Sequence, residues 1–237
     1  MTPERMARLR EVLARRQPDL TVVTDYVHKG RNLSAIVRNC DAVGIGTMHA
    51  AVPADEYRAF RGTAKGSHQW VRVVRHDTVE EALQHLKPQG FQIVAAHLSP
   101  RAVDFRDIDY TLPTAILMGA EREGVSDAGI ALADYEVTVP MLGMVESFNV
   151  SVAAGIILSE ASYQRQRAGL YDQCRLEDAE MQRLFFEWAH PKIKHFCLVN
   201  RVDYPPLAED GEIIDPAGWY AKVRQEIAER SATEDVC

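Results

Sequence analysis

Residues 139–161 read VPMLGMVESFNVSVAAGIILSEA, and the interpretation of the whole chain starts from this stretch. An apolar segment ends at Pro140, a loop containing Gly143 follows, and a helix-like run of small and apolar residues comes next. Ser147 and Asn149 are both residue types that favour a helix N-cap. A cap requires one of them, so the presence of both, with Glu146 beside them, indicates a functional site at the start of the helix.

The helix predicted after this loop carries small residues close together, namely Ser151, Ala153, Ala154 and Gly155. Side chains of this size allow another helix or backbone segment to approach closely. We interpret them as a packing feature of the fold.

Strand-like and helix-like segments alternate on both sides of this stretch. The hydrophobic pattern predicts strands at residues 20–23, 47–52, 71–75, 91–96, 114–118 and 135–139. It predicts helices at residues 3–16, 33–43, 77–87, 126–133 and 149–167, with Asn32 and Asp77 as N-caps of the second and third, and residues 53–70 as a connection. This alternation is typical of an α/β fold, a mostly parallel sheet with helices on both faces.

The pattern also divides the chain into three parts. Residues 1–19 are expected to form a basic N-terminal helix, residues 20–168 the α/β domain, and residues 169–237 a C-terminal extension. Within the extension, helices are predicted at residues 177–190 and from about 216 to 229.

Composition excludes several classes of protein. No apolar run approaches the ~18 residues of a membrane span. The four cysteines are far apart in the sequence and form no metal-ligand spacing, so we expect no metal, no disulfide framework and a cytosolic protein with reduced thiols. The net charge is −7, yet residues 1–31 hold seven Lys/Arg against four Asp/Glu. This segment is either a basic face for phosphates or an ordinary solvated helix.

Two further strand-to-helix junctions carry unusual residues. In HKGRNLSAIVRNCDAVGI, residues 28–45, the helical spacing places Ser34, Arg38 and Asp41 on one face. Arg38 is therefore either the ion-pair partner of Asp41 or a phosphate clamp. In ILMGAEREGVS, residues 116–126, Glu121 lies between Gly119 and Gly124, which allow tight turns and close approach to a ligand.

Together the three junctions resemble the SpoU/TrmH branch of the SPOUT superfamily of knotted RNA methyltransferases. The first carries the pattern N-x-S-A-I-x-R-x-x-D-A-x-G from residue 32, the second G-x-E-x-x-G from residue 119, and the third P-M-x-G-x-x-x-S-x-N-V-S-V-A from residue 140. The resemblance implies a deep C-terminal trefoil knot, a homodimer whose active site uses both chains, and S-adenosyl-L-methionine as methyl donor. It further implies that the substrate is the ribose 2′-hydroxyl of guanosine 18 in the D-loop of tRNA.

The resemblance also assigns residues to roles. The expected catalytic set is Arg38, Asn32, Glu121, Ser147 and Asn149. Arg38 is expected to activate the hydroxyl. Because a guanidinium is protonated at any ordinary pH, our hypothesis is that Arg38 grips the phosphate beside the target ribose. Asn32 would orient Arg38 or the same phosphate. Ser147 and Asn149 would hold the ribose or the arginine, and Glu121 would orient Asn32 or the loop.

The resemblance also implies which residues bind the methyl donor and which contact the tRNA. The donor would be bound by Ala96, Gly119, Val139, Met141, Leu142 and Phe148. The tRNA backbone would be contacted by Arg8, Arg15, Arg16, Lys29, Arg31, Arg165 and Arg167, and also by Arg58, Arg61 and Lys65.

Two alternatives stay open at this point. The same chemistry could serve ribosomal RNA or another position of tRNA. A non-catalytic RNA-binding protein of the same fold is a further alternative, although the complete set of expected catalytic residues argues against it.

Overall fold

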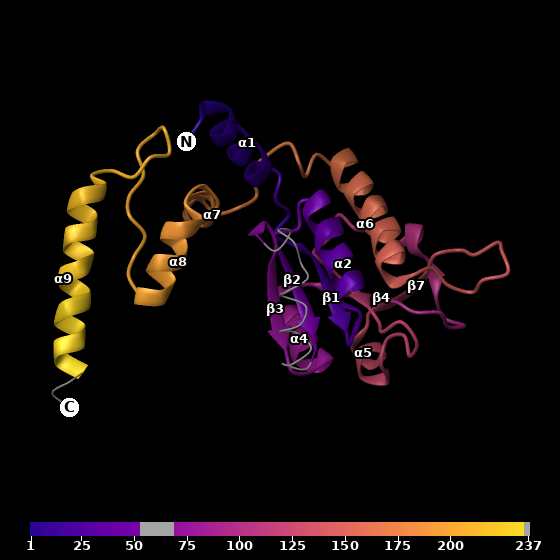
Figure 1. Cartoon of the computed structure of the whole chain (residues 1–237). Helices are drawn as coiled ribbons and strands as arrows, with labels where there is room; N and C mark the ends of the chain where they lie inside the picture. The colour runs from indigo at the N-terminus through magenta and orange to yellow at the C-terminus, as the bar shows by residue number, and fades with distance from the viewer. Residues whose placement is uncertain (53–68, 235–237) are drawn as a thin grey trace. The chain divides into compact units, whose positions relative to one another are not determined.

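The computed structural model describes residues 1–52 and 69–234, with side chains described as far as Arg230. The chain forms two compact units, one of residues 15–175 and one of residues 1–14 with residues 176–237. In the described part of the chain, no helix combines the length and apolar character that a membrane span requires. Figure 1 shows the elements of each unit.

A parallel sheet forms the centre of the larger unit. Its strand order is β3-β2-β1-β6-β4-β7-β5, and every pair of neighbours is parallel. The strands are β1 (Leu20–Asp25), β2 (Thr47–Ala51), β3 (Arg72–His76), β4 (Gln92–Ala96), β5 (Val103–Asp104), β6 (Thr114–Met118) and β7 (Tyr135–Thr138). The predicted α/β class and six predicted strands are confirmed. The sequence did not reveal β5, because two residues show no periodicity.

Helices cover both faces of this sheet. Helices α2 (Gly30–Ala42) and α6 (Val150–Arg167) lie side by side on one face, as Figure 1 shows. Helices α4 (Val79–Leu86) and α5 (Asp127–Leu132) pack on the other. Successive side chains of β1 point to opposite faces of the sheet. Leu20 and Val22 therefore pack in the hydrophobic core under α2 and α6, and Val23 packs in the core under α4 and α5.

Two predicted N-caps are wrong. Helix α2 begins three residues before the expected start of the helix, with Lys29 as its N-cap residue, so Asn32 lies inside the helix and its side chain is free for another contact. Helix α4 is capped by Thr78 rather than Asp77, since the Thr78 side chain accepts from the Glu81 amide. Of the two cap-favouring residues before α6, Asn149 is the N-cap, and Ser126 caps α5.

The smaller unit is helical. It contains α1 (Pro3–Ala14), α7 (Asp178–Ala189), α8 (Pro191–Asn200) and α9 (Pro216–Glu234), and α1 packs on α7. The sequence did not predict α8, which begins directly after α7 with Pro191 in its first turn. Proline is tolerated there because the first amides of a helix have no intrahelical acceptor.

Candidate active site

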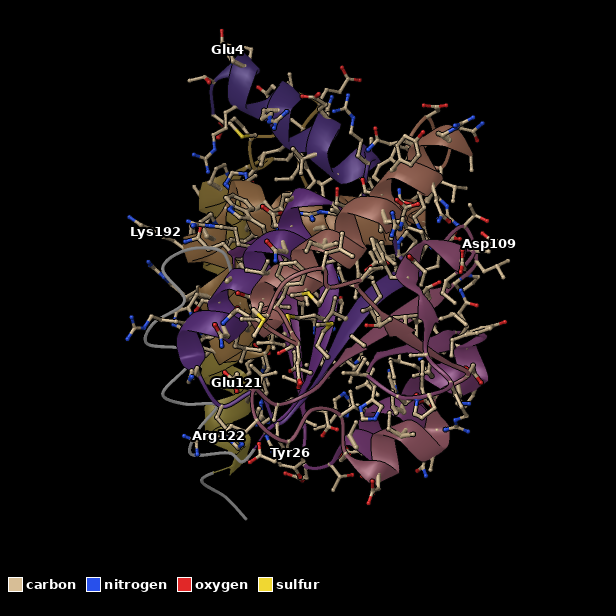
Figure 2. All side chains as sticks on the ribbon, turned by 90° about the vertical axis from the view of Figure 1, so that its right-hand side faces the viewer. Glu4, Tyr26, Asp109, Glu121, Arg122 and Lys192 are labelled. Atoms are coloured by element: carbon tan, nitrogen blue, oxygen red, sulfur yellow. The ribbon has the colours of Figure 1, made fainter. Side chains whose placement is uncertain are left out.

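A cavity of about 560 Å³ opens where β4, β6 and β7 end and α6 begins. Carboxyl ends of parallel strands meet at one edge of a sheet, which is where α/β proteins bind ligands. In Figure 2, Tyr26, Glu121 and Arg122, which follow the ends of β1 and β6, lie at one end of the sheet, and Asp109, which precedes β6, lies at the other. The cavity wall includes Ala96, His97, Gly119, Glu121, Val139 and Phe148.

The loop after β6 folds back on itself. The amide of Ala120 donates to the Gly124 carbonyl at 2.9 Å, and the amide of Gly124 donates to the Ala120 carbonyl at 3.0 Å. Gly124 has φ +71°, and a Cβ on Gly119 would lie 2.0 Å from the carbonyl carbon of Gly124. Both glycines are thus required by backbone geometry, and the loop they form holds Glu121 at the cavity.

A hydrogen-bonded chain of side chains joins the three sequence junctions. Asn32 Nδ2 donates to Glu121 Oε1 at 2.7 Å, and Asn149 Nδ2 donates to Asn32 Oδ1 at 3.2 Å. Asn149 Oδ1 at the same time accepts from the amide of Ser151 at 2.9 Å and so caps α6. Glu121, Asn32 and Asn149 therefore fix β6, α2 and α6 relative to one another at the cavity.

Glu121 is held as a carboxylate. Partial burial would raise its pKa, but hydrogen bonds from Asn32 and from backbone amides, among them that of Lys29, bring the pKa below its ordinary value. An ionised carboxylate that is already an acceptor is a weak proton acceptor near neutral pH. This geometry favours a positioning role for Glu121.

The structure gathers four of the five expected catalytic residues. Glu121, Ser147 and Asn149 line the cavity, and Asn32 touches two of them. Arg38 is exposed on α2 and is not part of the cavity wall of its own chain. It does not form the ion pair that its spacing allowed, since Asp41 accepts from Arg16 instead, at 2.8 Å.

Five of the six expected donor contacts line the cavity, namely Ala96, Gly119, Val139, Met141 and Phe148. Leu142 is fully exposed and is not part of the wall. His97 and Arg122 also line the cavity, and no sequence motif indicated either of them. The position of His97 directly after β4 was the signal that could have found it.

Two of the arginines expected to contact RNA are internal. Arg16 is 1% exposed and donates to the Ile45 carbonyl and to Asp41. Arg165 is 0% exposed and donates to Asp19 and to three backbone carbonyls. Their guanidinium groups are used inside the protein, so these two residues are withdrawn from the RNA-contacting set.

The other expected RNA contacts lie on the surface. Arg8, Arg15, Lys29, Arg31 and Arg167 are exposed, and Lys29 also lines the cavity. Arg167 lies over the ring of Tyr163 with its guanidinium carbon 5.8 Å from the ring centroid. Arg58, Arg61 and Lys65 lie outside the described residues. No cluster of three potential metal ligands of the His, Cys, Asp or Glu type occurs in residues 1–52 and 69–234.

A parallel sheet with a polar cavity at its carboxyl edge defines a ligand-binding α/β protein. Comparison with known proteins then shows its family. Residues 19–159 match the SpoU rRNA Methylase family, and residues 163–216 match the C-terminal region of SpoU rRNA methylases. The chain belongs to the SpoU rRNA methylase family.

One relative and two solved structures illustrate the match. The tRNA (guanosine(18)-2′-O)-methyltransferase of Escherichia coli (strain K12) is 49% identical over 226 residues, which is 94% of this chain and 99% of the relative. The TrmH/SpoU tRNA modifying enzyme of A. aeolicus superposes with a TM-score of 0.71 at 42% identity over 80% of this chain and 97% of its own. The SpoU methyltransferase AviRb from Streptomyces viridochromogenes, in complex with the cofactor AdoMet, has a TM-score of 0.54 at 29% identity. The match covers 64% of this chain and 62% of AviRb.

Proposed function

We propose that this chain methylates the ribose 2′-hydroxyl of guanosine 18 in the D-loop of tRNA, with S-adenosyl-L-methionine as donor. The observation that carries the proposal is the side-chain network of Glu121, Asn32 and Asn149, which brings the three motif junctions together at one cavity. The E. coli relative, named for this reaction and similar over nearly the full length of both chains, supports the substrate. The proposal places the enzyme in the cytosol with its tRNA.

The cavity suits the donor in size and in chemistry. A volume of about 560 Å³ is within the range of ~300–1,000 Å³ typical of small-molecule sites. Val139, Met141 and Phe148 offer apolar contact to the donor. Gly119 carries no side chain and none fits there, so the donor can approach the backbone closely at this position. When bound, the donor supplies an electrophilic methyl group on a positively charged sulfur.

The protein must align a weak nucleophile with that methyl group. A neutral 2′-hydroxyl reacts slowly, so holding it at attacking distance is the main contribution open to the chain. Ser147 and Asn149 line the cavity and offer hydrogen bonds to a ribose. Glu121 and Asn32 hold Asn149 in place. The proton of the hydroxyl would pass to the adjacent phosphate or to a transiently neutral guanidinium.

Arg38 enters this scheme from a second copy of the chain. In its own chain the side chain is exposed, outside the cavity wall, and makes no hydrogen bond or ion pair with another described residue. We therefore propose a homodimer in which Arg38 of the partner subunit grips the phosphate next to the target ribose. A bidentate guanidinium fork would fix the ribose in one orientation.

A deep trefoil knot belongs to the same proposal. Its support is the close packing of α6 against α2, where a Cβ on Gly155 would lie 3.2 Å from Asn39 Nδ2. Asn39 Nδ2 also donates to the Ser151 carbonyl at 2.8 Å. Threaded backbone requires small residues of this kind, and residues 151–155 supply them.

The reaction is tested by incubating the protein with labelled donor and either tRNA or ribosomal RNA, then mapping the labelled ribose. Label at guanosine 18 of tRNA is the expected result. Label confined to ribosomal RNA or to another nucleotide would refute the substrate, and no transfer to either RNA would refute the activity.

The role of Arg38 is tested by Arg38→Lys, which keeps the charge but loses the planar fork. Misplacing a reacting group by about 1 Å costs roughly 100-fold in rate, so a loss of that order in kcat is expected. Mixing this variant with Glu121→Ala should restore part of the activity, because a mixed dimer has one site with an intact cavity and an intact Arg38. Near-normal turnover of Arg38→Lys would show that the clamp is wrong. Absence of recovery in verified mixed dimers would show that the site is not shared.

A further inference from the structure

The connection between β4 and β5, residues 97–102 with the sequence HLSPRA, is unusually short. Strand β4 pairs with one edge of β7 and β5 with the other, and both Ala96 and Val103 lie level with Val137. Because the chain continues from β7 at both ends, the connection has to cross one face of this strand. It does so in six residues, whereas crossovers between parallel strands generally need a dozen or more. We call residues 97–102 the strap.

A single carboxylate of β7 binds the strap. Ser99 Oγ donates to Glu136 Oε2, and the Arg101 guanidinium donates to Glu136 Oε1. Within the strap, the Arg101 amide donates to Ser99 Oγ at 3.1 Å, and the Ala102 amide donates to the Ser99 carbonyl at 3.1 Å. Ser99 therefore both shapes the turn of the strap and links it to β7, and the strap crosses β7 on the face that Glu136 occupies.

The two links to Glu136 differ in strength. Glu136 is only 9% exposed. The hydrogen bond from Ser99 and the charges of Arg101 and His97 bring the pKa of Glu136 below its ordinary value, although burial opposes this. The Arg101 side chain is 75% exposed, and solvent weakens an ion pair of that kind. The hydroxyl of Ser99 is therefore the stronger link.

The strap also forms part of the cavity wall. Its first two residues, His97 and Leu98, line the cavity next to Val137 and Thr138 of β7. The His97 amide donates to the Val137 carbonyl at 3.1 Å, which fixes the start of the strap. A Cβ on Gly124 would lie 3.8 Å from His97 Nδ1, so the strap borders the loop after β6. Leu98 is 68% exposed, so a ligand in the cavity can cover apolar surface there.

We propose that Glu136 is a positioning residue for the methyl donor, which it serves by fixing the strap and so holding His97 and Leu98 at the cavity. Glu136 is not part of the cavity wall and acts through the strap. The inference rests on the proposed function, because it takes the cavity to be the donor site. A strap without its link to Glu136 samples other arrangements, which lack part of the wall. The apparent Kd then rises in inverse proportion to the fraction of molecules whose wall is complete.

Three variants of the full-length protein separate the links. Glu136→Ala removes both and should raise the Kd of the donor about ten-fold, which corresponds to a complete wall in about one tenth of the molecules. Ser99→Ala removes the stronger link from the strap alone and should raise the Kd by about 3- to 5-fold. Arg101→Ala removes an exposed partner and should change the Kd by less than about two-fold.

Asp104→Asn is the matched control. Asp104 lies on β5, two residues after the strap, forms an ion pair with Arg106 at 2.7 Å and is not part of the cavity wall. This variant loses a pairing of a carboxylate with an exposed arginine, as the Glu136 variant does, and should bind the donor like the unmodified protein. Circular dichroism and thermal unfolding establish which variants are folded. Ser99→Ala leaves every residue of the sheet unchanged, so it tests the proposal even if Glu136→Ala does not fold.

Isothermal titration calorimetry measures the Kd of the donor and, separately, that of its demethylated product. The product lacks only the methyl group and the positive charge, so a change in the wall should raise both Kd values by the same factor. In steady-state assays the KM for the donor should rise, while kcat at saturating donor and the KM for tRNA stay unchanged.

Unchanged donor affinity in the folded variants Glu136→Ala and Ser99→Ala would overturn the inference. A loss confined to the positively charged donor would overturn it too, because Glu136 would then act directly on the sulfonium charge. An equal loss in Asp104→Asn, or a fall in kcat at saturating donor, would also contradict it. If the unmodified protein binds no donor, the proposed function fails. If it binds the donor and the strap variants bind equally well, this inference alone fails.

Discussion

Substituting Arg165 tests how the end of α6 is joined to the rest of its unit. The buried guanidinium donates to five acceptors at 2.7–3.1 Å, which are Asp19 Oδ1, Gln17 Oε1 and the carbonyls of Asp19, Tyr110 and Leu112. Burial would raise the pKa of Asp19, but the hydrogen bonds from Arg175 and Arg165 hold it below its ordinary value. Asp19 is therefore a carboxylate at neutral pH, with Arg165 as its buried partner.

Arg165→Met keeps an unbranched apolar stem, shorter than that of arginine, and removes every one of these donors. Arg175 still binds both oxygens of Asp19, at 2.6 and 2.8 Å, and Leu112 still accepts from the Thr114 hydroxyl. Breaking a buried ion pair costs about 3–5 kcal/mol, and an acceptor left without a donor costs about 1–3 kcal/mol. Because Arg175 compensates in part, we expect a loss of about 3–4 kcal/mol.

Urea unfolding followed by circular dichroism measures this loss. Arg167→Met, two residues away on the surface of the same helix, is the control and should change the free energy of unfolding by less than about 0.5 kcal/mol. Arg165→Lys retains one charge and should fall between the two. If Arg165→Met unfolded at the same urea concentration as Arg167→Met, the buried network would contribute nothing and the reasoning would fail.

Two further predictions concern the loop after β6 and a histidine of β2. Gly119→Ala should abolish donor binding in equilibrium dialysis, because the added Cβ would lie 2.0 Å from Gly124 and force the loop open. Gly143→Ala is the control and should bind the donor normally, because nothing lies within 4 Å of its added Cβ. Burial, with the nearby His76 and His85, lowers the pKa of His49 to about 4, so the fold prefers the neutral imidazole. The unfolded chain takes up a proton near pH 6.5 and the folded chain near pH 4, so stability should decrease as pH falls through that window and level off below it. His49→Gln should flatten this dependence in thermal unfolding from pH 7 to 4, and an unchanged slope would contradict the assignment.

Much of the fold followed from local patterns. Six strands and the helices of the larger unit were predictable because apolar periodicity and flanking turn residues reflect interactions between neighbours in sequence. Two elements that show no such local pattern were not predicted. Strand β5 has only two residues, and helix α8 begins at a proline directly after α7. The cap of α2 was misplaced because Asn32 is a favourable cap residue, whereas its side chain is used by Glu121, 89 residues away.

The candidate site, too, was predictable from the sequence only in part. Glu121, Ser147 and Asn149 were predicted together, and the structure places them on one cavity. Their convergence could be anticipated because carboxyl ends of parallel strands share an edge. The choice of partner for Asp41 could not, because spacing offered Arg38 and the fold brings Arg16 closer.

The sequence by itself determined the α/β class, the junctions that carry the site and the residue types found there, because these depend on periodicity, capping and motif spacing. Only the tertiary structure decided that Arg16 and Arg165 are internal, since their acceptors come from segments far apart in the chain. It also decided that α1 joins the C-terminal helices in one unit, and that Arg38 lies outside the cavity of its own chain. A charge in a sequence carries no information on which partner will neutralise it, because that depends on which distant groups folding places within hydrogen-bond distance.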